Sequence, residues 1–161
     1  MSPSDVTNTY VVIGAVGIFS MPIMGWAADK VVGMSPSEAH ARKLMLIIGP
    51  VIAVLACGVL LMESESSTLF CILFAVYWAI VPGGVVGYLG SIFGRGALGS
   101  IYSLVALICM GGGLFVEPLV GGYLKDVSGG YSYSMAFSLG AFLIAALIAM
   151  TLPLARKMPA H

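Results

Sequence analysis

The chain has 161 residues, of which 60% are apolar and only 9% charged, and its net charge is zero. Soluble domains carry about 25% charged residues, so this sequence has too few polar side chains to cover a surface that faces water. A neutral chain without a basic run also gives no sign of nucleic-acid binding. The lipid bilayer is therefore the expected solvent and the first expected partner.

Five apolar runs are each long enough to cross the hydrocarbon core, which takes roughly 20 helical residues. Their residues do not alternate between apolar and polar, as they would in the strands of a membrane barrel. We therefore predict an all-α, polytopic transmembrane helix bundle that forms one domain over residues 1–161. In chain order the predicted spans are 10–28, 44–62, 69–92, 101–124 and 135–154.

The first run could also be read as a secretory signal. It lacks the basic n-region of such signals, because Asp5 is the only charged residue before Asp29. Further apolar runs follow at once. We therefore interpret residues 10–28 as a span.

The basic residues predict the orientation of these spans. Cytoplasmic loops are enriched in Lys and Arg. The opposite side has only Lys125 and the acidic "MESESS" loop, so we predict a multi-pass membrane protein with its N-terminus outside and its C-terminus in the cytoplasm. All other bases fall on the predicted cytoplasmic side: Lys30, Arg42, Lys43, Arg95, Arg156 and Lys157.

Small residues and helix breakers recur within the spans. Lipid supplies no hydrophobic drive between helices, so their interfaces depend on small residues that let backbones approach. Proline removes a helical hydrogen bond, and helices that are both closely packed and broken suit a protein that rocks between states. The spaced small residues are Gly83 and Gly87, Gly90 and Gly94, and Ala141, Ala145 and Ala149; the prolines are Pro22, Pro50, Pro82 and Pro118.

A charged junction follows the first span. "GWAADK" at residues 25–30, then a glycine, and later an Arg–Lys pair, resembles the loop signature of the major facilitator superfamily. That signature reads glycine, three mostly small residues, aspartate, a base, a spacer, glycine and two bases; here "MSPSEAHA" adds about eight residues to the spacer. The resemblance implies a loop motif that controls conformation, made of Gly25, Asp29, Lys30, Gly33, Arg42 and Lys43.

A second region strengthens this resemblance. "FGRGALGSIYSL" and "GGYLKDVSGGYSYSMAF" are similar to the last two helices of that superfamily, nearest to its oxalate/formate antiporters and monocarboxylate transporters. The resemblance implies part of the C-terminal half of a major facilitator fold. It also implies an N-terminal half that lies either on a partner chain or in a longer version of this protein. Asp29 would find its helix-capping partner in that half. The alternative partner is a second copy of this chain in a homo-oligomer.

Three residues within spans are candidates for the path of a substrate or proton. Glu117 is the only carboxylate inside a predicted span, and intramembrane ionisable residues mark functional sites by default. It lies only a turn or two from the outer end, so an interfacial side chain is the alternative. Tyr77 and Trp78 lie deeper than the usual aromatic belt, and helix packing is the alternative for both.

These observations favour a secondary transporter, or a fragment of one, that moves a small solute by alternating access. The resemblance implies a monocarboxylate- or oxalate-type organic anion, although the predicted spans contain no Arg or Lys to bind it. The alternative is a non-transporting membrane subunit or truncated paralogue that needs a partner chain. No catalytic triad, metal cluster or cofactor motif is present, so we expect neither an enzyme nor a bound metal or cofactor. Isolated His40 and His161, and the apolar settings of Cys57, Cys71 and Cys109, agree with that expectation.

Overall fold

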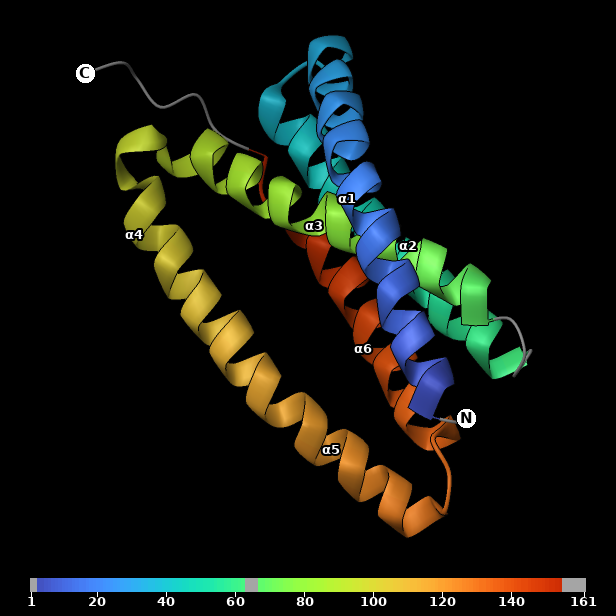
Figure 1. Ribbon diagram of the computed structural model, residues 1–161. Helices are drawn as coiled ribbons and strands as arrows, with labels where there is room; N and C mark the ends of the chain where they lie inside the picture. The colour runs from blue at the N-terminus through green and yellow to red at the C-terminus, as the bar shows by residue number, and fades with distance from the viewer. Residues whose placement is uncertain (1–2, 63–66, 155–161) are drawn as a thin grey trace.

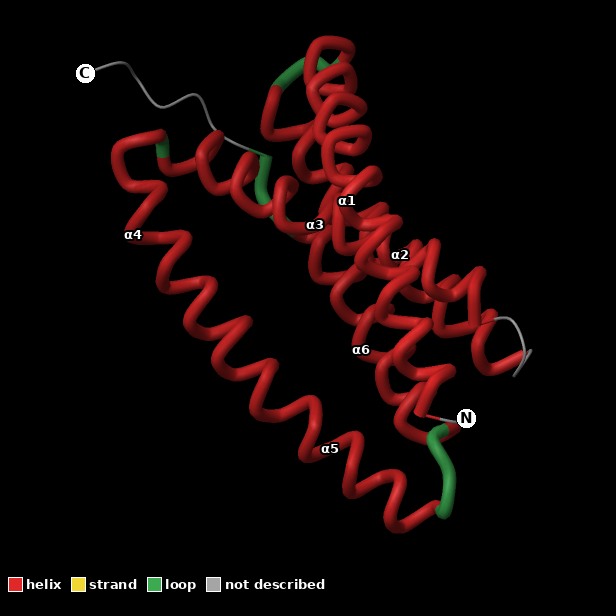
Figure 2. Tube along the Cα trace, in the orientation of Figure 1, coloured by secondary structure: helices red, strands yellow, loops and turns green. Residues whose placement is uncertain are grey.

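The computed structural model describes residues 3–62 and 67–154 (Figure 1). Every element in these residues is helical, which confirms the all-α prediction (Figure 2). The acidic loop at 63–66 and the basic tail residues Arg156 and Lys157 lie outside the described residues. In chain order the elements are α1 (Pro3–Met34), α2 (Glu38–Met62), α3 (Ser67–Phe93), α4 (Arg95–Ala106), the π-helical segment η1 (Leu107–Gly112), α5 (Gly113–Ser128) and α6 (Ser132–Thr151).

Four of the helices are long and apolar enough to cross a membrane. They are the segments Val11–Met34, Glu38–Met62, Thr68–Phe93 and Ser132–Thr151. Each contains most of one predicted span, so those four predictions are confirmed as long apolar helices. The side of the membrane on which each end lies stays a prediction.

The charged junction is helical, and the prediction that it forms a loop is wrong. Helix α1 continues to Met34 and α2 already begins at Glu38, so only residues 35–37 connect them. Asp29 and Lys30 therefore lie in α1, whereas Arg42 and Lys43 lie in α2. Helices α1 and α2 thus contain basic residues near their ends, whereas the shorter predicted spans contained none.

Ser37 explains why α2 begins so early. The backbone N–H of His40 donates to the Ser37 hydroxyl oxygen at 3.2 Å, and the N–H of Ala41 donates to the Ser37 carbonyl at 3.2 Å. A serine in this position satisfies one of the free N–H groups in the first helical turn. The last four residues that lengthen the spacer of the motif, 38–41, therefore form the start of α2.

The predicted fourth span falls across three consecutive elements. Helix α4, segment η1 and helix α5 follow one another without a loop, so residues 95–128 form one long interrupted rod. Short π-helical segments appear mostly as bulges within α-helices, often at functional sites. The parts of this rod are too short to count among the four long apolar helices, and the five-span count stays a prediction.

Helix α2 is the centre of a bundle that also contains α1, α3 and α6. Small residues let α2 and α3 approach closely, as is typical of membrane helices. A Cβ built on Gly49 would lie 2.5 Å from Cγ2 of Val81, and one built on Gly84 would lie 3.4 Å from Cβ of Met45. The buried small residues of α2 are Ala39, Ala41, Gly49, Ala53, Ala56 and Cys57.

Several spaced small residues do not have the predicted packing role. A Cβ on Gly83 would meet nothing within 4 Å, and Gly94 has φ +79°, which ends α3 and turns the chain into α4. That left-handed conformation favours glycine because it has no Cβ. On α6 the buried alanines are Ala146 and Ala149, while Ala141 and Ala145 are exposed.

The rod of α4, η1 and α5 stands apart from the bundle and meets it near its two ends (Figures 1 and 2). Helix α4 contacts α3, and α5 contacts α6. In the described part of the chain, no Cα atom of α5 lies within 8 Å of α1, α2 or α3. Between its two ends, the rod therefore does not pack its backbone against α1, α2 or α3.

Candidate functional site

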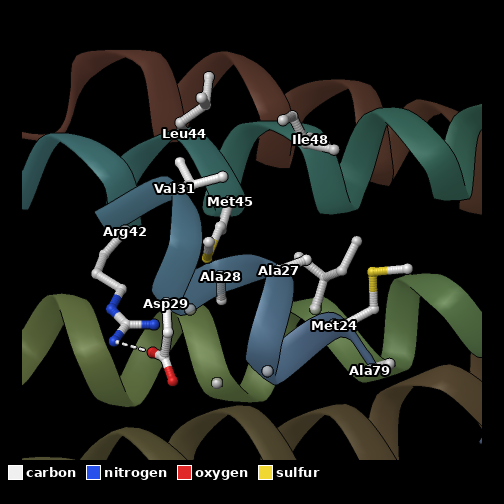
Figure 3. Close-up of a pocket in the computed structure, with 14 residues that line it drawn as sticks. Met24, Ala27, Ala28, Asp29, Val31, Arg42, Leu44, Met45, Ile48 and Ala79 are labelled. Carbon is white, nitrogen blue, oxygen red and sulfur yellow. Dashed lines mark hydrogen bonds and ion pairs between the residues drawn. The ribbon is translucent and has the colours of Figure 1, made fainter. Parts of the chain in front are cut away.

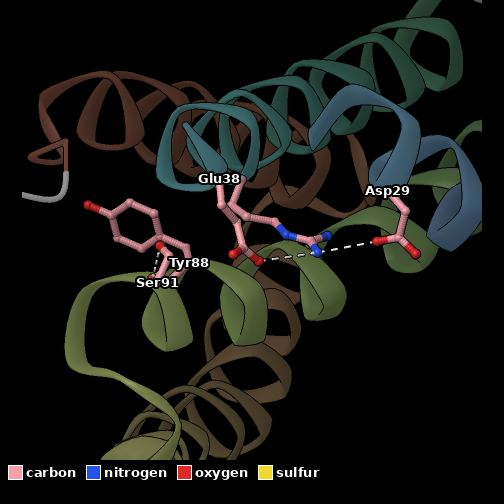
Figure 4. A network of polar contacts seen from close by, with 5 residues as sticks. Asp29, Glu38, Tyr88 and Ser91 are labelled. Carbon is pink, nitrogen blue, oxygen red and sulfur yellow. Dashed lines mark hydrogen bonds and ion pairs between the residues drawn. The ribbon is translucent and has the colours of Figure 1, made fainter. Parts of the chain in front are cut away.

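An ion-pair network joins α1 to α2 at the charged end of the bundle (Figure 4). One guanidinium nitrogen of Arg42, Nη2, lies 3.3 Å from Oδ1 of Asp29 and 3.7 Å from Oε1 of Glu38. The Arg42 side chain is 16% exposed, whereas that of Asp29 is 75% exposed. Asp29 is thus ion-paired within this chain, and its helix-capping partner in an N-terminal half stays a prediction.

Gly87 of α3 makes room for the Arg42 side chain. A Cβ built on Gly87 would lie 2.5 Å from Nε and 2.7 Å from Cδ of Arg42. The Nε atom is buried and has no hydrogen-bond partner in the described residues. Arg42 therefore joins three helices, through its ion pairs with α1 and α2 and its contact with α3.

Two further residues hold the end of α6 at this same place. The Lys43 ammonium donates to the Leu152 carbonyl at 2.8 Å, and the Tyr88 hydroxyl donates to the Pro153 carbonyl at 2.6 Å. The last carbonyls of a helix have no intrahelical donors, and a cation near them is favourable. Lys43 thus has a structural partner that the motif alone does not indicate.

The other members of the predicted motif are more exposed. The Lys30 ammonium lies 4.2 Å from the centroid of the Trp26 ring, a cation–π distance. A Cβ on Gly25 or Gly33 would meet nothing within 4 Å in the described residues. The close approach that the resemblance implies for Gly25 therefore stays a prediction.

A small cavity of about 290 Å³ adjoins the ion pair, between α1, α2 and α3 (Figure 3). Arg42 and Asp29 point toward one another at one end of it. The remaining labelled wall is apolar and comes from Met24, Ala27, Ala28, Val31, Leu44, Met45, Ile48 and Ala79.

A larger cavity of about 740 Å³ brings together all three residues predicted for the substrate or proton path. Tyr77 and Trp78 come from α3, and Glu117 comes from α5 across the space between bundle and rod. We call it the aromatic cavity. Its other lining residues are Cys57, Leu60, Phe70, Phe74, Gly113, Val116, Gly121, Tyr131, Ser134, Met135, Phe137, Ser138, Ala141 and Phe142.

Tyr77 is at the centre of the aromatic wall. Its ring centroid lies 5.2 Å from that of Phe142 on α6 in an edge-to-face arrangement, and 5.6 Å from that of Phe74. The Trp78 ring follows at 6.3 Å. Such ring pairs are favourable beyond the apolar area that they bury, so the wall is a well-defined surface.

Glu117 and Trp78 lie equally far along the chain from an end of their helices. It precedes Ser128, the last residue of α5, by 11 residues (128 − 117), or about 16 Å at 1.5 Å per residue. Trp78 follows Ser67, the first residue of α3, by 11 residues (78 − 67), again about 16 Å. The two residues are thus each about three turns from an end of their helix, and the interfacial alternative for Glu117 stays a prediction.

The α5–α6 hairpin forms the remaining wall. The Ser134 hydroxyl donates to the Gly121 carbonyl at 3.0 Å, and the Ser138 hydroxyl donates to the Ser134 carbonyl at 3.1 Å. Near the hairpin turn, the Lys125 ammonium lies 5.0 Å from the Tyr131 ring centroid. A hydrogen bond with the Tyr131 side chain is the largest cause that raises the pKa of Lys125, so this base keeps its charge.

Sequence reasoning missed much of the aromatic wall. Phe70, Phe74 and Tyr77 are spaced by four and three residues, which places them on one helix face, and that periodicity was the available signal. The contribution of Phe142 depends on how α6 packs against α2, which brings its ring to Tyr77 of α3. Nothing in the spacing of α6 alone indicates it.

The described residues contain no group of three or more His, Cys, Asp or Glu side chains that could hold a metal ion. Comparisons of the chain with protein-family models, with curated proteins and with solved structures found no match. The resemblance to the major facilitator superfamily therefore stays a prediction that depends on the quoted motifs.

Proposed function

We propose that this chain is an integral, multi-pass membrane protein that moves a small solute across the bilayer by alternating access, as a secondary transporter or part of one. The observation that carries the proposal is the aromatic cavity. It joins the only carboxylate of the rod's apolar part, Glu117, to a wall of aromatic rings on the bundle. Its volume lies within the range of small-molecule sites.

The arrangement of the rod supports movement of one wall of this cavity. Helix α5 contacts the bundle through α6 alone among the described helices, and the π-helical segment η1 and Pro118 interrupt its regular hydrogen bonding. Hinge motions of packed helices concentrate in such irregular segments. Rocking of the rod against the bundle would open the cavity to one side and then the other.

The ion-pair network supports the same proposal from the other end of the bundle. Arg42 contacts three helices through one guanidinium, so a relative shift of α1, α2 and α3 would change its contacts together. The family resemblance implies a conformational role for these residues. In this chain the network would favour one of the two states.

Uptake into proteoliposomes tests the proposal. Purified chain is reconstituted and assayed with radiolabelled solutes of three classes: a monocarboxylate, oxalate and an organic cation. We expect saturable uptake of one class without any other chain, and its loss in Glu117→Gln. The alternative, a subunit that needs a partner, predicts no uptake of any class until a second chain is added.

The Asp126→Asn variant is the matched control for this assay. Asp126 lies on the same helix as Glu117, nine residues further on (126 − 117), and does not line the cavity. It should transport as the unmodified chain does. Equal loss of uptake in both variants would contradict a specific role for Glu117.

A further inference from the structure

We infer that the aromatic cavity binds an organic cation, with the Glu117 carboxylate as its counter-ion and the aromatic wall as its second contact. The inference rests on the proposed function and names the substrate class of the same cavity. It departs from the organic anion that the family resemblance implies. Three observations carry it: the charge of the lining, its aromatic content and the position of the nearest base.

The first observation is the charge of the lining. Glu117 is its single carboxylate, and no Lys, Arg or His is among the described residues that line the cavity. An anion would enter a low-dielectric space with no positive side chain and one negative side chain in the wall, which is unfavourable on both counts. A cation would neutralise a carboxylate that is otherwise costly within a membrane.

The second observation is the aromatic content. Seven of the lining residues have aromatic rings, on α3, on α6 or directly before α6: Phe70, Phe74, Tyr77, Trp78, Tyr131, Phe137 and Phe142. The faces of such rings attract ammonium groups, and tryptophan does so most strongly. The rings would also receive the apolar part of the solute. An amine or quaternary ammonium with an apolar or aromatic substituent fits both contacts.

The third observation is the position of Lys125, the base nearest to the cavity along α5. Its ammonium lies against the Tyr131 ring and outside the lining, eight residues beyond Glu117 (125 − 117), or about 12 Å along the helix. The base nearest to the cavity is therefore held against a ring and contributes no positive charge to the lining that an anion could use. Removal of the Glu117 charge should therefore weaken binding of a cation, whereas removal of the Lys125 charge should weaken binding only of an anion.

A series of three probes with one benzyl-sized ring tests the charge of the ligand. The probes are benzyltrimethylammonium, benzyl alcohol and benzoate, and the readout is the fluorescence of Trp78 in detergent-purified chain. The chain has two tryptophans, so Trp26→Phe leaves Trp78 as the only one. We expect saturable binding of the cation, at least tenfold tighter than that of the alcohol or of benzoate.

Three variants in the Trp26→Phe background locate the charge. Glu117→Gln should weaken cation binding at least tenfold, because the amide keeps the shape and loses the charge. Lys125→Gln should leave cation binding unchanged or tighten it up to threefold. Asp126→Asn should leave it unchanged.

Other outcomes overturn the inference and separate its failure from that of the proposed function. Tightest binding of benzoate, lost in Lys125→Gln, would show an anion site and leave the proposed function intact. Cation binding that Glu117→Gln does not change would also contradict the inference. No saturable binding of any probe would overturn the inference alone if proteoliposomes still take up a solute, and both proposals if they do not.

Discussion

The glycines at the α2–α3 interface and those of the rod have opposite surroundings. In the bundle, a Cβ on Gly49 or Gly87 would come within 2.5 Å of a side chain on the neighbouring helix. In the rod, a Cβ on Gly112, Gly113 or Gly121 would meet nothing within 4 Å. The same residue type thus permits close packing at the α2–α3 interface and occupies open space in the rod.

This difference separates two uses of glycine in a membrane helix. In the bundle, glycine lets α2 and α3 approach, and packing of that kind holds helices together where lipid supplies no hydrophobic drive. In the rod no neighbour requires a small residue, so what glycine contributes is conformational freedom, at a cost in helix stability. A firm bundle beside a deformable rod is the arrangement that a moving cavity wall needs.

The largest expected effect is at the bundle interface. Gly49→Ala should lower the free energy of unfolding by about 1–3 kcal/mol, because the new Cβ would overlap Val81, whose branched side chain cannot turn away freely. Unfolding by SDS in mixed micelles measures the change. Gly58→Ala, in the same helix with open space around it, is the control and should be neutral or slightly stabilising. Equal effects at both positions would remove the packing role assigned to Gly49.

Replacement of glycine by alanine in the rod should raise the free energy of unfolding, not lower it. The double change Gly112→Ala and Gly113→Ala should raise the free energy of unfolding by about 1–2 kcal/mol, because alanine is the better helix former and nothing obstructs its side chain. Solute uptake should fall several-fold at the same time, since a stiffer rod moves less. The same unfolding assay and proteoliposome uptake provide the two readouts. A variant that is more stable and transports at the original rate would show that these glycines are not needed for movement.

A smaller effect is expected at the end of α6. Tyr88→Phe should destabilise the chain by about 1 kcal/mol, because the Pro153 carbonyl loses its donor at 2.6 Å beside a ring that is 6% exposed. Tyr123→Phe, on the rod and 68% exposed, should change stability by less than about 0.5 kcal/mol. Thermal unfolding of both variants in one detergent makes the comparison. An unchanged melting temperature for Tyr88→Phe would mean that this hydrogen bond does not hold α6.

The smallest effects are expected in the ion-pair network. Asp29→Asn should cost about 0.5 kcal/mol, because the carboxylate is largely exposed and its attraction to Arg42 is screened. Glu38→Gln, with the longer ion-pair distance of 3.7 Å, should cost less. A double-mutant cycle with Arg42→Gln measures the coupling of each acid to the base. Stronger coupling for Glu38 than for Asp29 would contradict the order of the distances.

Hydropathy was sufficient to predict the helices but not their ends. The four long apolar helices follow directly from runs of apolar residues, whereas α1 and α2 extend through Asp29, Lys30, Arg42 and Lys43. A span boundary predicted from hydropathy falls at the first charged residue, whereas a helix ends where its terminal backbone groups find capping partners. Ser37 was the residue that indicated where α2 begins, because serine is preferred at the start of a helix.

Three residues of the aromatic cavity were predicted singly, but the cavity itself was not. Glu117 was identified by its charge in an apolar run, and Tyr77 and Trp78 by their depth. That they line one cavity depends on which faces of α3, α5 and α6 meet. In lipid, the outward and inward faces of a helix are both apolar, so hydropathy does not distinguish them.

Accessibility of the aromatic cavity from the two sides of the membrane tests the central claim most directly. Ser138 lines the cavity on α6 and is replaced by cysteine in a chain whose Cys57, Cys71 and Cys109 are changed to alanine. A membrane-impermeant thiol reagent is then applied to sealed vesicles of each orientation. Alternating access predicts labelling of residue 138 from both sides, with slower labelling when benzyltrimethylammonium is present. Labelling from one side only, at a rate that does not change with the probe, would contradict the account.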